Sequence, residues 1–271
     1  MPEKIISTQN PRIKQAIKLH HSRGRQAQGR IIIFGNREVG RAIDAGIKIE
    51  EIFLHENSAD LWRKRLSNTD FSLLEKVTEV SNEVFEKIQY GNRSEALIAI
   101  AQRPTTDLIK FNPLENRSLL VVIDSVEKPG NLGAIARSAD GCGAAGLLIS
   151  NPVTDPFHPN SIRSSTGVLF GLPIAVGSSD EIAAWLDDHL FEVFVASLEG
   201  AEDFYATKFS GSTAIVLGNE ATGVSENWLS SKDYRRVKIH MHGIADSLNV
   251  SATASVMMFE ASRQLSLQNL E

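Results

Sequence analysis

The sequence predicts an α/β protein, with a large and mostly parallel sheet in its C-terminal part and a smaller α/β unit before it. Three observations support this fold class. Short apolar segments alternate with helical segments beyond residue 118, which is typical of parallel strands joined by helices. A strand–helix–strand pattern occupies residues 30–56. Residues 103–117, with two prolines and little periodicity, separate the two parts.

The smaller unit contains the sequence RIIIFGNREVGRAIDAGIKIEEIFLHE at residues 30–56, which we interpret as a strand, a helix and a second strand. Residues 79–90 (EVSNEVFEKIQY) predict a further helix. Residues 96–102 (ALIAIAQ) predict a closing strand. We see no internal repeat and no low-complexity segment.

The larger unit contains six short apolar segments that predict strands, at residues 119–124, 146–150, 173–177, 191–197, 213–218 and 235–240. Predicted helices lie between most of them or follow them, at residues 133–144, 159–170, 180–189 and from residue 250 onward. We therefore expect an N-terminal domain at residues 1–105, a linker at residues 106–117 and a second domain at residues 118–271.

Composition limits the class of protein. The chain has 271 residues, 42% of them hydrophobic and 23% charged, which is ordinary for a soluble globular protein. No apolar run approaches the roughly 18 residues that a membrane span needs, and the first residues lack the apolar core of a signal peptide. The one cysteine, Cys142, excludes an intrachain disulfide. We expect a cytoplasmic protein that does not enter a membrane.

Charge is distributed unevenly along the chain. The net charge is −5, but residues 1–30 carry seven basic residues and one acid, a net +6, which leaves −11 for the rest. Such a basic arm can bind the phosphates of a nucleic acid, and the candidate contacts are Arg12, Lys14, Arg23 and Arg25. The alternative is a terminal helix and loop whose charges only face water.

Three loops at predicted strand ends carry polar residues, and ligands of parallel sheets bind at such ends. The first loop opens a helix, on which Asn131 and Arg137 lie nearly two turns apart and can share one face. The second loop, LGNEATGVSE, has Gly218 and Gly223 on either side of Glu220. The third runs from the strand VKIH at residues 237–240 through MHGIAD to a Ser-Leu-Asn segment.

Each loop also has a simpler interpretation. The glycine-rich turn before Arg137 lacks the G-x-G-x-x-G spacing of a dinucleotide site. Glu220 can cap a helix, and Arg137 can pair with it. His240 and His242 have no third ligand in the sequence pattern, so we predict no metal site.

The C-terminal helix has two apolar faces. Val250, Ala254, Met257, Met258, Ala261 and Leu265 form one face, and Ala252, Val256 and Phe259 form the other. Such a helix needs cover on both sides, from its own domain and from a second subunit. Three polar residues, Ser247, Asn249 and Ser251, surround its start. One of them is enough for an N-cap, so the others favour a ligand at this end.

The three loops resemble the three signature motifs of the SpoU (TrmH-like) branch of the SPOUT RNA methyltransferases. EKPGNLGAIARSADGCGA resembles motif one, IVLGNEATGVSE motif two, and VKIHMHGIADSLNVSATASVMMFEA motif three. DPFHPNSIRSSTGVLFGLP resembles the intervening segment, with Arg163 in a matching place. The N-terminal part is similar to the substrate-binding domain of many members, a fold like that of a small ribosomal RNA-binding protein.

The resemblance implies methyl transfer from S-adenosylmethionine to the ribose 2′-hydroxyl of RNA. Ribosomal RNA is the expected target, and transfer RNA is the alternative. The resemblance also implies a trefoil knot in the C-terminal sheet and a homodimer with the knot at its interface. The cofactor contacts implied are Leu217, Gly218, Gly223, Ile239, Met241 and Leu248. Arg163 joins the RNA-binding candidates.

The resemblance assigns the catalytic positions to Arg137, Asn131, Glu220, Ser247 and Asn249. Because a guanidinium normally stays protonated in proteins, we expect Arg137 to bind the phosphate or ribose and to stabilise charge developing on the oxygen. Arg137, the phosphate and water remain alternatives as the proton acceptor. Asn131 and Glu220 would place Arg137 and the ribose.

Two positions depart from the family pattern. His240 stands where the family usually has proline, and FGNRE replaces an acid–glycine pair in the N-terminal part. Two other functions compete with methyl transfer, namely a non-catalytic RNA-binding protein of the same fold and a nucleotide-dependent oxidoreductase. The presence of Arg137, Asn131 and Glu220 argues against the first, and the missing dinucleotide fingerprint argues against the second.

Overall fold

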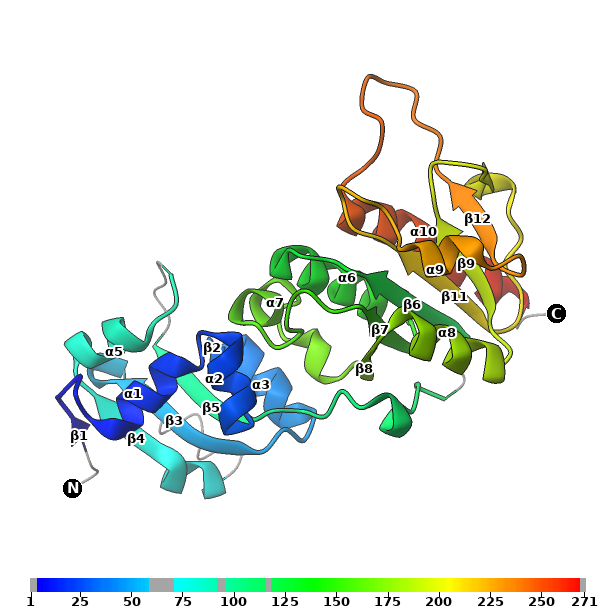
Figure 1. Ribbon diagram of the computed structural model, residues 1–271. Helices are drawn as coiled ribbons and strands as arrows, with labels where there is room; N and C mark the ends of the chain where they lie inside the picture. The colour runs from blue at the N-terminus through cyan, green and yellow to red at the C-terminus, as the bar shows by residue number, and fades with distance from the viewer. Residues whose placement is uncertain (1–3, 59–70, 92–95, 116–117, 269–271) are drawn as a thin grey trace. The chain divides into compact units, whose positions relative to one another are not determined.

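The protein is described by a computed structural model that covers residues 4–58, 71–91, 96–115 and 118–268. It forms two compact units. Unit 1 comprises residues 1–104 and 157–171, and unit 2 comprises residues 105–156 and 172–271. The end of the expected linker, residues 116–117, lies outside the described residues. Figure 1 shows both units with their helices and strands.

Unit 1 is built around a mixed sheet of five strands in the order β1-β4-β3-β5-β2. The strands are β1 (Lys4–Ile5), β2 (Arg30–Phe34), β3 (Ile49–His55), β4 (Val77–Val80) and β5 (Leu97–Gln102). β3 pairs in parallel with β4 and antiparallel with β5, and β5 is antiparallel to β2. The predicted strands at residues 30–56 and 96–102 are thus confirmed. The short β1 and β4 were not predicted.

The helices of unit 1 are α1 (Pro11–Lys18), α2 (Ser22–Gln28), α3 (Asn36–Asp44), α5 (Asn82–Ile88) and α7 (Pro159–Ser164). 3-10 turns occur at η1 (Glu56–Ser58), η2 (Phe71–Lys76) and η4 (Val168–Phe170). α1 and α5 pack their apolar faces on the sheet around Ile13, Leu19 and Phe85. The basic N-terminal arm thus forms the helices α1 and α2.

Unit 2 contains a parallel sheet of seven strands in the order β10-β12-β9-β11-β6-β7-β8. The strands are β6 (Leu119–Asp124), β7 (Gly146–Ser150), β8 (Ile174–Gly177), β9 (Glu192–Ala196), β10 (Glu202–Asp203), β11 (Thr213–Leu217) and β12 (Arg235–Lys238). Every pair in the sheet is parallel. Every predicted strand of this unit is present, so the mostly parallel α/β sheet is confirmed.

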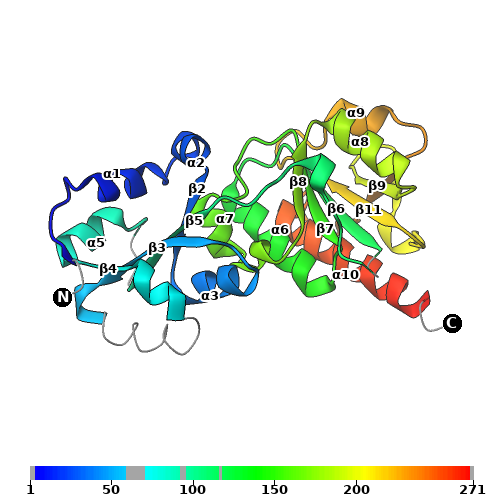
Figure 2. The ribbon, with the colours of Figure 1, turned by 90° about the horizontal axis from the view of Figure 1, so that it is seen from below.

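Helices cover both faces of this sheet, as Figure 2 shows. They are α6 (Pro129–Cys142), α8 (Ser179–Asp188), α9 (Glu226–Ser230) and α10 (Val250–Gln268), with 3-10 turns η3 (Leu108–Lys110) and η5 (Phe204–Ala206). α8 and α9 pack on one face through Ile182, Leu186 and Trp228. α6 and α10 pack against each other, and both contact the sheet. β6, β7 and β11 are therefore completely buried, as strands covered on both sides must be.

The order of the strands reverses beside β6. From β6 the chain proceeds through β7 and β8 to one side, and then returns so that β11 lies on the other side of β6. The loops that leave the carboxyl ends of β6 and β11 therefore start next to each other. In parallel sheets this reversal is the position at which ligands bind.

One predicted helix differs from the structure. Residues 159–170 form α7 and η4 rather than a single helix. Thr166 and Gly167 have positive φ angles of 57° and 84°, which no helix interior accepts. This segment also groups with unit 1, although it lies between two strands of unit 2 in the sequence.

Candidate active site

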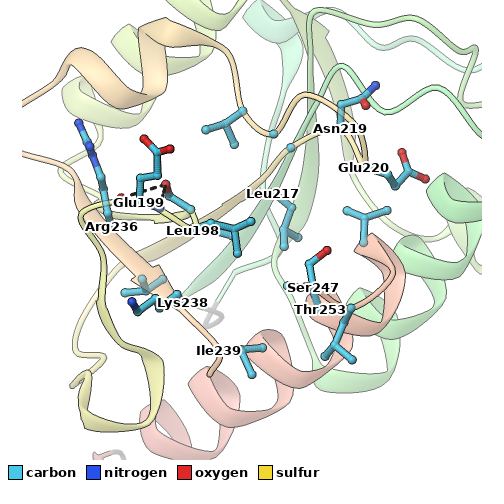
Figure 3. A pocket seen from close by; sticks show the side chains of 18 of the residues that line it. Leu198, Glu199, Leu217, Asn219, Glu220, Arg236, Lys238, Ile239, Ser247 and Thr253 are labelled. Atoms are coloured by element: carbon cyan, nitrogen blue, oxygen red, sulfur yellow. Dashed lines mark hydrogen bonds between the residues drawn. The ribbon is translucent and has the colours of Figure 1, made fainter. Parts of the chain in front are cut away.

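A cavity of about 460 Å³ opens at the carboxyl ends of β9, β11 and β12. Its walls come from the loop after β9, the loop after β11, the end of β12 and the first turns of α10. Figure 3 shows Leu217 and Ile239 facing this space, with Ser247 just before α10 and Thr253 on its first turn. A volume of this size is within the range of about 300–1,000 Å³ found for small-molecule and cofactor pockets.

All six predicted cofactor residues line this one cavity, although they come from two separate loops of the sequence, the second and the third. They are Leu217, Gly218, Gly223, Ile239, Met241 and Leu248. Two of the predicted catalytic residues, Glu220 and Ser247, line it as well. The parallel arrangement of β11 and β12 around β9 explains this convergence, because the carboxyl ends of parallel strands share one edge.

Gly218 shows why the second loop requires glycine at its start. A Cβ atom at this position would lie 2.2 Å from the carbonyl carbon of Gly223 and 2.3 Å from the amide nitrogen of Val224. The backbone after β11 therefore folds back on itself at a distance that no side chain permits. Asn219 and Gly223 then exchange two backbone hydrogen bonds of 2.9 and 3.0 Å, which closes the loop around Glu220.

Motif-one and motif-two residues meet beside the cavity. The Nδ2 of Asn131, in the first turn of α6, donates a hydrogen bond to Oε1 of Glu220. Arg137 lies nearly two turns further along α6 and is exposed. It is not one of the residues that line the cavity. The structure therefore joins Asn131 with Glu220 and leaves Arg137 on an open surface of the helix.

The polar residues before α10 divide into two roles. Oδ1 of Asn249 accepts a hydrogen bond from the amide of Ser251 at 3.0 Å, and the carbonyl of Asn249 accepts from Ala252 and Thr253. Asn249 is therefore the N-cap of α10. Ser247 and Leu248, immediately before the cap, line the cavity. In this segment, Asn249 therefore caps the helix, and Ser247 and Leu248 line the cavity.

Several residues of the cavity were not identified from the sequence. The loop after β9 adds Ser197, Leu198 and Glu199, and β12 adds Arg236 and Lys238. The Nη2 of Arg236 donates to the carbonyl of Leu229 at 2.5 Å. An acid two residues after the predicted apolar strand at residues 191–197 was the available signal for Glu199. This signal places Glu199 in the cavity only when the strand order is known, because β9 lies between β11 and β12.

The cavity combines apolar walls with carboxylates. Leu217, Ile239 and Leu248 supply apolar surface, and Glu199 and Glu220 supply negative charge. Backbone groups of the loop after β11 are within reach of a ligand because Gly218 and Gly223 carry no side chain. Arg236 and Lys238 add positive charge. The cavity therefore fits a ligand with a flat heterocycle and charged groups of both signs, and S-adenosylmethionine has these.

One candidate RNA contact of unit 1 is corrected by the structure. Arg25 is completely buried, and its Nη1 donates to the carbonyls of Leu19 and His20 at 2.9 and 3.0 Å. It therefore caps the carboxyl end of α1 instead of facing a phosphate. Arg12 donates to Oε1 of Glu51 and to Thr78, which places its charge in an ion pair. Lys14 and Arg23 are exposed on α1 and α2.

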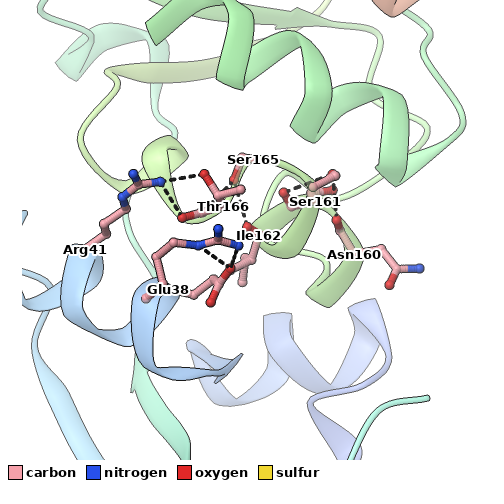
Figure 4. Close-up of polar contacts among 10 residues, drawn as sticks. Glu38, Arg41, Asn160, Ser161, Ile162, Ser165 and Thr166 are labelled. Carbon is pink, nitrogen blue, oxygen red and sulfur yellow. Dashed lines mark hydrogen bonds and ion pairs between the residues drawn. The ribbon is translucent and has the colours of Figure 1, made fainter. Parts of the chain in front are cut away.

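Arg163 is exposed on α7, whose surrounding segment is bound tightly to the rest of unit 1. The Nη1 of Arg41, on α3, donates to the carbonyl and to the hydroxyl of Thr166 at 2.7 and 2.5 Å, as drawn in Figure 4. Glu38 of the same helix closely contacts Gly167. These contacts hold the segment of α7 in place within unit 1, and Arg163 is exposed on this helix.

Two kinds of site are absent from the part of the chain that the structure describes. No group of three His, Cys, Asp or Glu side chains there is arranged to hold a metal ion. None of the helices described has the length and apolar composition needed to cross a membrane.

Two family models match the chain. The model of the SpoU rRNA methylase family matches residues 118–259. The model of the MRM3-like substrate binding domain matches residues 10–99. Together these matches cover most of both units. They agree with the resemblance found in the three motifs and in the N-terminal part.

Individual relatives match over nearly the whole chain. The 23S rRNA (uridine(2479)-2′-O)-methyltransferase of Streptomyces viridochromogenes is 30% identical, over 96% of this chain and 92% of the relative. The 23S rRNA (guanosine(2553)-2′-O)-methyltransferase RlmP of Bacillus subtilis is 23% identical, over 95% and 98%. The crystal structure of an AdoMet-bound rRNA methyltransferase from Sinorhizobium meliloti superposes with a TM-score of 0.86 at 27% identity, over 97% of this chain and 98% of that one.

Proposed function

The chain belongs to the SpoU rRNA methylase family, and we propose that it transfers a methyl group from S-adenosylmethionine to a ribose 2′-hydroxyl of ribosomal RNA. The observation that carries the proposal is the convergence of the predicted cofactor residues on one cavity. A similar protein of known structure, matched over 97% of this chain, was crystallised with AdoMet.

The cofactor is held by the loop after β11, the end of β12 and the segment before α10. Leu248 and Ile239 provide apolar contact for the adenine, and the backbone around Gly218 provides hydrogen bonds. Leu217, Gly223 and Met241 complete these walls. When bound, S-adenosylmethionine supplies a methyl group that its sulfonium has already activated.

The chain's own residues orient the ribose and stabilise charge. In the reaction the ribose oxygen forms a bond to the methyl carbon, the carbon–sulfur bond breaks with its electrons going to sulfur, and the hydroxyl proton passes to Arg137, the phosphate or water. Holding these atoms in line contributes about 7–11 kcal/mol to the lowering of the barrier. Arg137 binds the phosphate or ribose and stabilises the developing oxyanion. The Asn131–Glu220 pair positions Arg137 and the ribose.

RNA is bound by unit 1. Lys14, Arg23 and Arg163 present exposed positive charge on three of its helices, and phosphate contacts of this kind position a nucleic acid without reading its sequence. The match of residues 10–99 to a substrate binding domain supports this assignment. Ribosomal RNA is favoured over transfer RNA because two relatives matched over 92% and 98% of their own length are named for 23S rRNA.

The active form is a homodimer. Phe259 of α10 is 52% exposed and lies over Gly141 of α6. Ile244, in the loop before α10, is completely exposed. A second copy that covers this face would also lie beside Arg137, which precedes Gly141 by about one helical turn. The dimer therefore completes the site by covering Arg137 and the exposed loop.

Three further features belong to this proposal. The C-terminal segment forms a trefoil knot, residues 1–105 form the RNA-binding domain, and residues 118–271 form the methyltransferase domain, apart from residues 157–171, which group with unit 1. The protein acts in the cytoplasm, which contains its RNA substrate and keeps the thiol of Cys142 reduced.

The proposal is tested by replacing Arg137. Methyl transfer from labelled S-adenosylmethionine to RNA from cells that lack this protein is measured together with the affinity for the cofactor. Arg137→Ala should lower transfer by at least about 100-fold, because an electrostatic donor to the developing oxyanion is lost. Its cofactor affinity should stay unchanged, because Arg137 does not line the cavity.

The matched control is Asp140→Ala, an exposed charged residue one turn later on α6, which should retain transfer. Mapping of 2′-O-methyl positions in total RNA, with and without the protein, then identifies the target nucleotide. Full activity of Arg137→Ala, or no change anywhere in the methylation map, would refute the proposed function.

A further inference from the structure

The loops of motifs one and two are joined by hydrogen bonds of three side chains, those of Asn131, Asn219 and Glu220. Asn131 bonds to Glu220 at the tip of the second loop. Behind this contact, Nδ2 of Asn219 donates to the carbonyl of Ser125 at 3.0 Å and to Oε1 of Glu127 at 3.2 Å. The second loop is thus attached to the first at the residue next to Glu220.

Asn219 also shapes its own loop. Its Oδ1 accepts hydrogen bonds from the amides of Ala221 and Thr222 at 2.8 and 3.4 Å. Its backbone amide and carbonyl pair with Gly223. Both polar ends of the side chain are therefore engaged, the amide with the first loop and the oxygen with the second. Rotation of this side chain would break contacts in both loops.

The far end of the same loop is fixed by Asp124, which is completely buried at the end of β6. Oδ2 of Asp124 accepts the amide of Ser225 at 2.7 Å. Its Oδ1 accepts from Ser150 at 2.8 Å and from Asn151 at 3.0 Å. The loop between Gly218 and Ser225 is therefore held at both ends by contacts to the strand beside it.

We propose that Asn219 is a positioning residue, which holds Glu220 and the backbone from Gly218 to Gly223 in the shape that binds the cofactor. Asn219 itself lines the cavity, and its role is to hold these groups in place rather than to take part in the chemistry. The inference rests on the proposed function, because it takes the cavity beside this loop as the cofactor site. It assigns to Asn219 a role distinct from that of Glu220, which faces the reaction.

The substitution Asn219→Asp tests this role with almost no change of shape. It removes the donor to Ser125 and places a second carboxylate beside Glu127. We expect the dissociation constant for S-adenosylhomocysteine, measured by calorimetry, to rise about tenfold or more, because a donor to a charged group is lost and like charges meet. Circular dichroism should show an intact fold.

Asn227→Asp is the matched control. Nδ2 of Asn227 donates to Oδ1 of Asp180 at 2.6 Å. The substitution Asn227→Asp therefore also places two carboxylates next to each other in unit 2. Asn227 does not line the cavity, and its substitution should leave the dissociation constant within about twofold of the wild-type value. Equal weakening by both substitutions would show a general loss of stability and would overturn the inference.

A second substitution tests the pair directly. Adding Glu127→Gln to Asn219→Asp gives the new carboxylate an amide donor in place of a like charge, so affinity should recover about threefold or more. The inference is overturned if Asn219→Asp binds like the wild type or if the second substitution restores nothing. If the wild-type protein itself does not bind S-adenosylhomocysteine, the proposed function fails, and the inference fails with it.

Discussion

At the end of β6, Asp124 accepts hydrogen bonds on both carboxylate oxygens, from side chains on one and from a backbone amide on the other. An asparagine at this position has one NH₂ group in place of a carboxylate oxygen. In one orientation this NH₂ group would face the side-chain amide of Asn151, and in the other it would face the backbone amide of Ser225, so two donors would meet in both cases. The carboxylate is therefore required by the donors around it, although it carries no part of the reaction.

The substitution Asp124→Asn should lower the free energy of unfolding by about 1–3 kcal/mol, since it leaves a buried donor unsatisfied. Urea denaturation measures this change. Asp140→Asn, at an exposed position of α6, should change the value by less than about 0.5 kcal/mol. Equal stability of both variants would contradict the role of Asp124.

Single residues also show where sequence reasoning stops. The predicted cofactor residues were found because a family motif marks them, and they line one cavity. Arg25 was placed among the phosphate contacts because of its charged neighbours, yet it points inward to cap α1. The direction of a side chain depends on the turn between α1 and α2, and local composition does not encode that turn.

At the scale of elements, α10 follows its pattern closely. All six residues of its first predicted apolar face are buried, namely Val250, Ala254, Met257, Met258, Ala261 and Leu265. On the second face, Ala252 and Phe259 are exposed in the single chain and Val256 is half-buried. A single chain therefore buries the first apolar face of α10 and leaves much of the second exposed. In the dimer that we propose, a second copy covers the second face.

Phe259→Glu should separate this dimer, because it places a charge in an apolar interface. Light scattering after size-exclusion chromatography should give the mass of two chains for the wild type and of one chain for the variant. Ile109→Glu, at another exposed apolar position, should remain dimeric. A wild-type protein that is monomeric at all concentrations would contradict the dimer.

Other elements were predicted with unequal success. The long strands of unit 2 were recognised because strands buried on both faces are continuous apolar segments. β1 and β10 have two residues each, too few for any pattern. α7 ends where Thr166 and Gly167 adopt positive φ angles, and only contacts with Arg41 and Glu38 explain why the chain turns there.

At the scale of the whole molecule, what the sequence did not contain is strand order. The alternation of strands and helices predicted a parallel sheet. It did not place β11 between β9 and β6, which is what brings the loops of the cavity together. Nor did it reveal that residues 157–171 group with unit 1. The position of β11 and the grouping of residues 157–171 both depend on contacts between segments that are distant in the sequence. A local sequence pattern cannot predict such contacts.

A crystal structure of the protein with S-adenosylhomocysteine tests the central claim most directly, because it locates the ligand without reference to activity. We predict that the adenine lies between the backbone of Gly218 and the side chains of Ile239 and Leu248, within about 4 Å of each. Ligand bound at any other place in either unit, with this cavity empty, would contradict the account.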